Sequence, residues 1–121
     1  MKKFEVQFYE KRNGDVPVEQ FLNSLDMKMR AKLVGIISIL QDYGNQLREP
    51  YSKIIEDGIY EIRGQVGNNI TRVLYFFYCD GKIILTNGFI KKSQKTPREE
   101  IEKAKKYRND YIERCKSDEK V

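Results

Sequence analysis

Residues 60–97 read YEIRGQVGNNITRVLYFFYCDGKIILTNGFIKKSQKTP. Runs rich in β-branched and aromatic residues, at 59–64, 70–79 and 82–89, have the composition of strands. A loop containing Gly and Asn separates the first two runs, and Asp80-Gly81 is a strong hairpin signal between the last two. Apolar residues occupy both faces of these strands. The stretch therefore predicts an antiparallel sheet that is covered on both sides over part of its length.

The segment before this sheet predicts a further strand and a helical hairpin. Residues 2–9 alternate, with Phe4, Val6 and Phe8 on one face and the polar Lys3, Glu5 and Gln7 on the other, which is the period of a half-buried strand. Two helices follow in close succession, with Asp15 and Asp26 in position to cap their N-termini. Gly44 stands where the second helix needs a left-handed residue to end it.

The remaining segments complete the expected order of elements. Residues 45–57 are polar and include Pro50, so we expect a connection there. Thr96-Pro97-Arg98-Glu99 has the form of a capping box and predicts a last helix, whose end from Ser117 we expect to fray. The order β-α-α-β-β-β-α predicts an α+β fold in one compact domain, residues 1–121. Its four-stranded sheet is mainly antiparallel, with the helical hairpin on one face and a C-terminal helix.

Length and charge narrow the class of protein. A chain of 121 residues suits one hydrophobic core, and its net charge is +5. Residues 1–59 carry nine basic and nine acidic side chains, whereas residues 60–108 carry eleven basic and five acidic ones. The excess of positive charge in residues 60–108 favours attraction of a polyanion. The alternative is a solubility surface without a partner.

Several classes of protein are disfavoured by what the sequence lacks. Cys79 and Cys115 are too few for a disulfide framework, no signal peptide begins the chain, and every apolar run is short. We therefore expect a cytoplasmic protein without a membrane partner. The chain has no histidine and no zinc-site pattern, and no Asp-x-Asp cluster argues for magnesium. We expect no metal or other cofactor.

Arg63 and Arg72 are the first candidate site residues, because they lie on neighbouring strands. If they stand opposite each other their guanidinium groups converge, whereas a slip of one residue sends them to opposite faces. Like charges side by side on a sheet are unfavourable, so convergence would indicate an anionic ligand. The alternative is that each arginine pairs with a local acid such as Glu61.

The end of the last strand supplies the other candidates. Lys91, Lys92 and Lys95 lie between that strand and the capped helix, where free N–H groups add positive charge, so this junction is a candidate phosphate pocket. A solvated charged turn is the alternative. Tyr60 and Phe89 are the aromatic residues best placed to stack a nucleobase, although most aromatic residues on strands belong to the core.

Three strings together resemble a known family: YEIR, RVLYFFY and NGFIKKSQKTP. The chain resembles the RelE/ParE superfamily of toxins from bacterial toxin–antitoxin systems, and most of all its HigB-type, phage-derived branch. The likeness covers nearly the whole chain. It implies a RelE-like sheet with a helical hairpin, and ribosome-dependent cleavage of messenger RNA by an mRNA interferase. It also implies a helix-turn-helix, HigA-like antitoxin encoded nearby.

The resemblance also implies roles for the candidate residues. Arg63, Arg72, Lys91, Lys92 and Lys95 match the family's catalytic cations by type and position, and Tyr60, Phe89 and Gln94 are expected to bind substrate. Some HigB toxins use histidines, which this chain lacks, so the base is either Glu61 or a lysine whose pKa is lowered by its cationic neighbours. We expect attack by the RNA 2′-hydroxyl without a metal. A ParE-like inhibitor of DNA gyrase and a non-catalytic RNA- or DNA-binding module are the alternatives.

Overall fold

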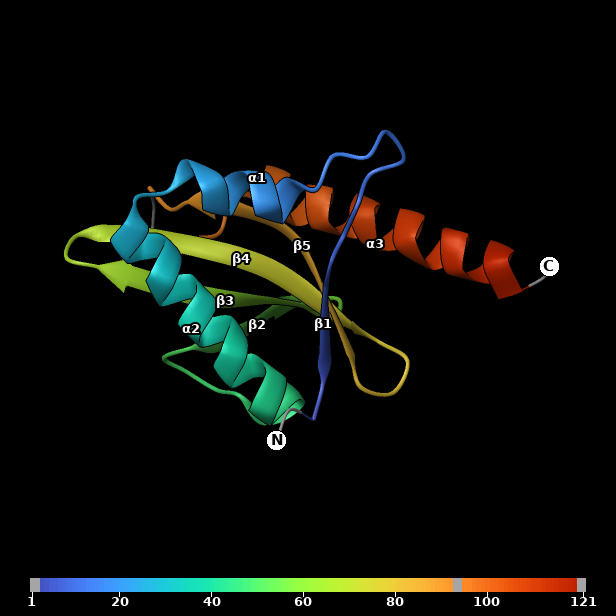
Figure 1. Cartoon of the computed structure of the whole chain (residues 1–121), viewed down its shortest axis with the longest axis horizontal. Helices are drawn as coiled ribbons and strands as arrows, with labels where there is room; N and C mark the ends of the chain where they lie inside the picture. The colour runs from blue at the N-terminus through green and yellow to red at the C-terminus, as the bar shows by residue number, and fades with distance from the viewer. Residues whose placement is uncertain (1–2, 93–94, 120–121) are drawn as a thin grey trace.

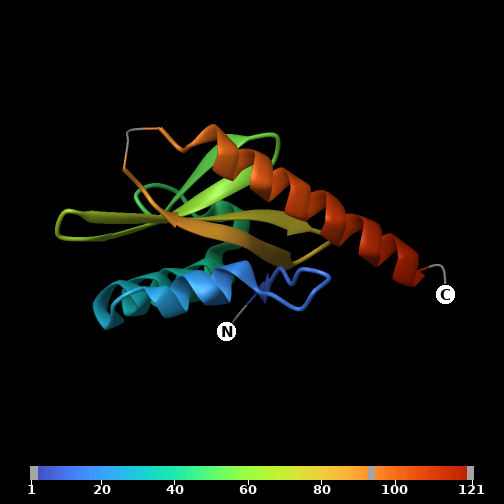
Figure 2. The same ribbon diagram turned by 90° about the horizontal axis from the view of Figure 1, so that it is seen from above.

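The computed structural model describes residues 3–92 and 95–119 and contains a five-stranded sheet with helices on both faces (Figures 1 and 2). In chain order the elements are β1 (Glu5–Phe8), α1 (Pro17–Ser24), α2 (Met27–Tyr43), the short 3₁₀ helix η1 (Gly44–Gln46), β2 (Ser52–Glu56), β3 (Ile59–Val66), β4 (Asn69–Tyr78), β5 (Lys82–Ile90) and α3 (Arg98–Glu119). The predicted α+β class and the helical hairpin are confirmed.

The strands lie in the order β1-β5-β4-β3-β2. The neighbours from β2 to β5 pair antiparallel, as predicted, and β1 joins the sheet parallel to β5 at the opposite edge. β4 and β5 are joined at Asp80-Gly81, where Gly81 has a φ of 83°. The central strands β3, β4 and β5 are therefore the rigid platform on which the site is built.

The prediction of a mere connection over residues 45–57 is wrong, because β2 occupies its end. The signal that marks this strand is Asp57-Gly58, whose φ values of 50° and 76° are those of a tight hairpin turn. β2 is an edge strand, and its central Ile54 is 58% exposed. Because only one side of an edge strand is paired, its composition can be polar enough to resemble a loop.

The predicted helix caps have different outcomes. The side chain of Asp26 accepts a hydrogen bond from the backbone N–H of Met29 at 2.8 Å, so it caps α2 as expected. The prediction for Asp15 is wrong, since Val16 takes the N-cap position of α1 and Pro17 begins the helix without a side-chain cap. Proline has no N–H to satisfy, so a first turn that starts with it needs less capping.

The predicted capping box before α3 is also corrected. The helix begins at Arg98, and the hydroxyl of Thr96 donates its hydrogen bond to Glu61 on β3 instead of capping the helix. At its other end α3 continues to Glu119, past Ser117 where fraying is expected. None of the described helices is long and apolar enough to cross a membrane.

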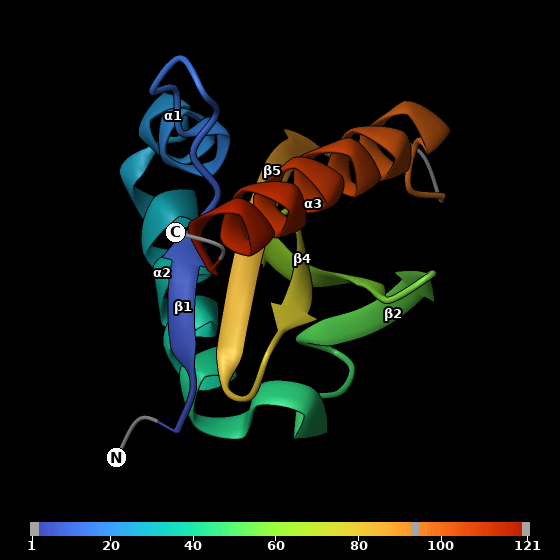
Figure 3. The same cartoon turned by 90° about the vertical axis from the view of Figure 1, so that its right-hand side faces the viewer.

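Two layers of core residues enclose the sheet, as the apolar content of the strands predicts (Figures 2 and 3). α1 and α2 pack on one face, where Leu33 and Leu40 are fully buried, and α3 packs on the other through Ala104. Gly88 allows α1 to approach, because a Cβ there would overlap the ring of Phe21. Both faces of β3 and β4 are therefore closed over most of their length.

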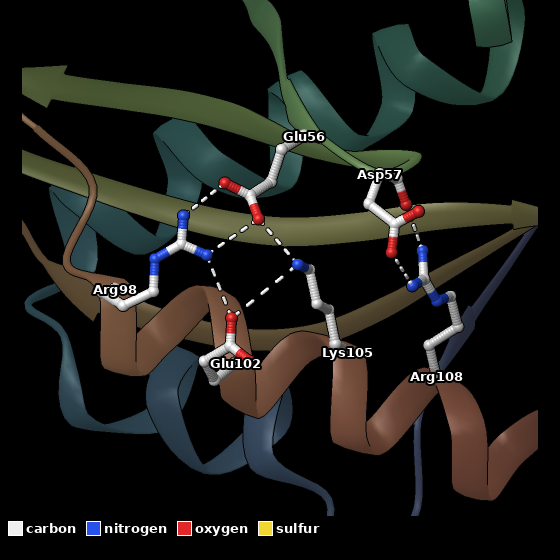
Figure 4. Close-up of polar contacts among 6 residues, drawn as sticks. All are labelled: Glu56, Asp57, Arg98, Glu102, Lys105 and Arg108. Atoms are coloured by element: carbon white, nitrogen blue, oxygen red, sulfur yellow. Dashed lines mark hydrogen bonds and ion pairs between the residues drawn. The ribbon is translucent and has the colours of Figure 1, made fainter.

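A cluster of ion pairs holds α3 against the turn between β2 and β3 (Figure 4). Glu56 accepts from Arg98 Nη1 at 2.8 Å and from Lys105 Nζ at 2.6 Å, and Arg98 also pairs with Glu102 at 3.0 Å. One turn further along α3, Arg108 pairs with Asp57 at 2.8 Å. Each of these ion pairs includes a side chain at least one-third exposed, and Arg98, Glu102 and Asp57 are more than half exposed, so the contacts orient α3 more than they stabilise the fold.

The pKa values of Glu56 and Asp57 are lowered, for Glu56 mainly by the hydrogen bond from Lys105 and for Asp57 by the one from Arg108. A lowered pKa in the folded state means that the stability from these carboxylates is complete above their ordinary values of 4.5 and 3.8. We expect that stability to be lost as the pH falls below those values, and the loss to be smaller in Glu56→Gln. Thermal unfolding measured at several pH values tests this.

Glu113→Gln, which changes an exposed carboxylate on the same helix, is the control and should keep the wild-type pH dependence. High salt should narrow the difference between Glu56→Gln and wild type, since exposed ion pairs are screened. An equal acid response of Glu56→Gln and wild type would contradict the role given to the ion pairs.

Candidate phosphate-binding site

Arg63 and Arg72 stand directly opposite each other in the antiparallel pairing of β3 and β4. This register settles the alternative left open by the sequence, because opposed residues project from the same face. The face is the one covered by α3, on which Leu74 and Phe76 of β4 are also buried. α3 begins part-way along the sheet, and the loop end of the β3–β4 hairpin extends beyond it (Figure 2).

Glu61 lies beside the two arginines and shares one carboxylate oxygen with both. Its Oε2 is 3.2 Å from Arg63 Nε and 3.2 Å from Arg72 Nε, and the side chain is only 1% exposed. Pairing with a local acid is therefore the interpretation that the structure supports. Arg63 also pairs with Glu49 at 2.9 Å, but that carboxylate is 64% exposed, whereas Glu61 is the buried acid that Arg63 and Arg72 share. The triad itself carries a net positive charge and can attract an anion.

Arg72 is the more buried of the two arginines, at 7% exposure. Its Nη1 donates to the carbonyl of Thr71 at 2.9 Å, but Nε has no hydrogen-bond partner in the described part of the chain. The 3.2 Å contact with Glu61 is thus an ion pair without hydrogen-bond geometry. Burial lowers the pKa of Arg72 and Glu61 opposes this shift. A guanidinium stays protonated in proteins, so this buried donor remains a cation.

Thr96 connects this triad to the segment that precedes α3. Its hydroxyl donates to Glu61 Oε1 at 2.7 Å, so both oxygens of the carboxylate have partners. A buried carboxylate with each oxygen engaged is fixed in position. Glu61 therefore sets the positions of Arg63 and Arg72, and α3 is tied to the same group through Thr96.

Lys91 extends the cationic surface on the same face. Its backbone N–H donates to the carbonyl of Ile70 at 2.8 Å, which continues the ladder one residue beyond β5. The pKa of Lys91 is lowered from its ordinary value, chiefly by burial and then by repulsion from Arg72, and Arg63 and Lys53 add to the repulsion. Lys53 stands opposite Glu61 on β2. The sequence could not identify Lys53 as a site residue because its strand was taken for a connection.

The other predicted lysines, Lys92 and Lys95, are exposed in the segment between β5 and α3. Gln94, predicted to bind substrate, lies outside the described residues. Four predicted residues, Glu61, Arg63, Arg72 and Lys91, are brought together.

Tyr60 and Phe89 do not lie where a base could stack beside the arginines. Tyr60 is on the opposite face of the sheet, stacked on Tyr75 with ring centroids 5.4 Å apart. Phe89 shares the arginine face but is 8% exposed and packs within the core under α3. Strand aromatic residues most often fill the core, and these two follow that rule.

A cavity of about 300 Å³ opens beside the arginines at the edge of the sheet. Its lining consists of Lys32, Ile36, Pro50, Tyr51, Arg63, Gln65 and Arg72. Sequence reasoning missed Lys32 and Tyr51, which come from α2 and from the segment before β2. No motif marks either residue, and only their spatial convergence on the arginines identifies them.

Residues 20–109 match the model of a family described as phage-derived protein Gp49-like (DUF891). The match covers β2 to β5, all of α2 and more than half of α1 and of α3, and it contains every site residue described above. The chain belongs to this family. It is a RelE-like family whose members are often toxin-like. No curated protein matches the chain.

Membership in the Gp49-like family agrees with the phage-derived, RelE-like resemblance of the sequence. The narrower assignment to the HigB-type branch stays a prediction. The cluster of Arg63, Arg72 and Lys91 on a rigid sheet has the chemistry of a candidate site for anions such as phosphate. Within the described residues, no three Cys, Asp or Glu side chains gather as metal ligands would.

Glu61→Gln should destabilise the protein strongly, because it leaves Arg63 facing Arg72 without a shared anion. Removing one partner of a buried ion pair costs about 3 kcal/mol. Glu49→Gln is the matched control, since Glu49 pairs with the same Arg63 at 2.9 Å but is 64% exposed. Urea unfolding of the three proteins measures the difference. Equal losses for the two variants would show that Glu61 does not organise the arginines.

Proposed function

We propose that the protein is the toxin of a type II toxin–antitoxin pair and cleaves messenger RNA on the ribosome. The observation that carries the proposal is the opposition of Arg63 and Arg72 around one shared carboxylate, with Lys91 on the same face. Such a cluster suits a phosphodiester, whose transition state for cleavage gains negative charge. Family membership supports a toxin in the broader sense.

The proposed reaction is attack by the RNA 2′-oxygen on its own neighbouring phosphorus. The 2′-O–P bond forms, the P–O5′ bond breaks, and the products are a 2′,3′-cyclic phosphate and a 5′-hydroxyl. Arg63 and Arg72 would neutralise the oxygens of the phosphorane-like transition state through paired N–H donors. The fixed carboxylate of Glu61 keeps both guanidinium groups in place, which spares the cost of ordering them during the reaction.

Lys91 is the general base that the geometry favours. Burial and neighbouring cations lower its pKa, which favours the neutral amine that a base needs to accept the 2′-hydroxyl proton. Glu61 is less suited to this role, because its two oxygens already contact Arg63, Arg72 and Thr96. Lys92 or Lys95, in the adjoining segment, would return a proton to the leaving O5′.

An antitoxin would have to neutralise this surface. We propose a HigA-like, helix-turn-helix antitoxin, encoded nearby, whose acidic or amphipathic segment covers the cations or blocks entry to the ribosome. Complementary charge would speed this association and fix its orientation. Loss of toxicity on co-expression of the neighbouring open reading frame is the expected result, and unchanged toxicity would count against this partner.

Induction of the wild-type protein should produce new messenger RNA 5′ ends within translated frames. Arg72→Ala should lower their yield about 100-fold or more, the usual effect of losing a charge-stabilising donor. Arg72→Lys keeps the charge but loses the paired donors and should be impaired as well. Arg12→Ala, which removes an exposed arginine of the loop before α1, should leave cleavage unchanged. Mapping 5′ ends at single-nucleotide resolution measures all four proteins.

Growth arrest with intact messages would contradict the ribonuclease and would point to a protein target such as gyrase. Binding of RNA without cleavage would point to a non-catalytic module. Trapped gyrase–DNA complexes distinguish the first of these outcomes from the second.

The role of Lys91 makes cleavage dependent on pH. A base must be unprotonated, so the rate should rise with pH above neutrality and level off before the ordinary lysine value of 10.5. Lys91→Arg keeps the positive charge but not the base, and it should lower the rate roughly 100-fold and remove the rising limb. Single-turnover cleavage on programmed ribosomes provides the profile. A rising limb retained in Lys91→Arg would assign the base elsewhere.

A further inference from the structure

We propose that the cavity beside β3 is a subsite for one nucleotide of a single strand, in which Lys32 contacts the phosphate and Tyr51 stacks on the base. The inference rests on the proposed function, because it places this nucleotide next to the phosphodiester held by Arg63 and Arg72. It adds two residues to the substrate-binding surface.

The charges in the cavity favour a phosphate. Lys32, Arg63 and Arg72 contribute three positive charges to the lining, and the lining includes no acidic side chain. Arg72 is more than nine-tenths buried, and its Nε lacks a hydrogen-bond partner in the part of the chain that the structure describes. That Nε lies 3.2 Å from Glu61 Oε2, so an anion in the cavity would act as a second counter-ion for the guanidinium.

The apolar part of the cavity favours a nucleobase. Tyr51 is 40% exposed, and its ring contacts no other aromatic ring among the described residues. Pro50 and the buried Ile36 line the cavity with it. An exposed aromatic ring amid cations is the usual platform for an unpaired base. The volume of about 300 Å³ matches the lower end of small-ligand pockets.

The strand pattern explains why the cavity forms at this place. β2 pairs with β3 only from Ser52 onward, so the outer edge of β3 beyond Arg63 has no neighbouring strand. The backbone N–H of Arg63 donates to the carbonyl of Tyr51 at 2.9 Å, which fixes Tyr51 next to this arginine. Lys32 reaches the same edge from α2. A strand of RNA crossing the arginine pair would thus run from Lys91 on one side to this cavity on the other.

Two probes separate phosphate binding from base stacking: inorganic phosphate and a nucleoside 3′-monophosphate, each titrated into the purified full chain by NMR. Lys32→Gln should weaken the binding of both probes several-fold. Tyr51→Leu should weaken the mononucleotide about fivefold or more and leave inorganic phosphate unchanged, since stacking requires the base. In wild type the amides of residues 63–65 should shift with both probes.

Matched controls exist for both substitutions. Lys28→Gln changes an exposed lysine on the same helix, and Tyr43→Leu changes an exposed tyrosine at its end, and neither residue lines the cavity. With a 2′-deoxy oligonucleotide, Lys32→Gln should also reduce the salt dependence of log Kd by about 0.7, the value for one phosphate contact on a single strand. Lys28→Gln should leave that slope unchanged.

The subsite is overturned if Tyr51→Leu and Tyr43→Leu bind the mononucleotide equally, or if both lysine variants behave alike. These assays need no cleavage, so they are independent of the proposed reaction. Tyr51-dependent binding without messenger cleavage would contradict the proposed ribonuclease activity and support the subsite. If Tyr51→Leu changes neither cleavage nor binding, the subsite is contradicted and the proposed ribonuclease activity stands.

Discussion

The shared carboxylate of Glu61 is the interaction on which the site depends. The register of β3 and β4 puts Arg63 directly opposite Arg72, and two like charges so placed would repel each other on a bare sheet. A single buried anion, 3.2 Å from each Nε, makes this register tolerable, and the exposed Glu49 also pairs with Arg63. In the function that we propose, phosphate binding and fold stability are linked through the side chain of Glu61.

The position of α3 is coupled to the same group. Thr96 bonds the second oxygen of Glu61, and the first turns of α3 are held to the β2–β3 turn by Glu56 and Asp57. Movement of the helix start would therefore disturb the carboxylate that orders the arginines. β2 and the residues that flank it have two roles in this arrangement: Glu56 and Asp57 receive α3, and Tyr51 and Lys53 lie near the cations.

The sequence was most informative where chemistry and local pattern coincide. The strands around Asp80-Gly81, the hairpin capped by Asp26, and the triplet Arg63, Arg72 and Lys91 could all be predicted from residue type and spacing. Register could not, because residues 73–77 of the partner strand β4 are apolar on both faces and do not favour one alignment. β2 was missed since an edge strand of five residues resembles a polar loop.

Lys32 and Tyr51 could not be predicted for a different reason. No local motif marks either residue, and only the folded chain brings both of them next to Arg63 and Arg72. For Tyr60 and Phe89 the reverse holds, because both lie near the cations in the sequence but their side chains pack in the core.

The most direct test of the proposed site is the crystal structure of the protein with a short single-stranded RNA, methylated at its 2′-oxygens to prevent cleavage. We expect a phosphate within hydrogen-bond distance of both Arg63 and Arg72, with Glu61 in its present place; RNA bound elsewhere, with the arginines contacting only Glu61 and Glu49, would contradict the proposed site.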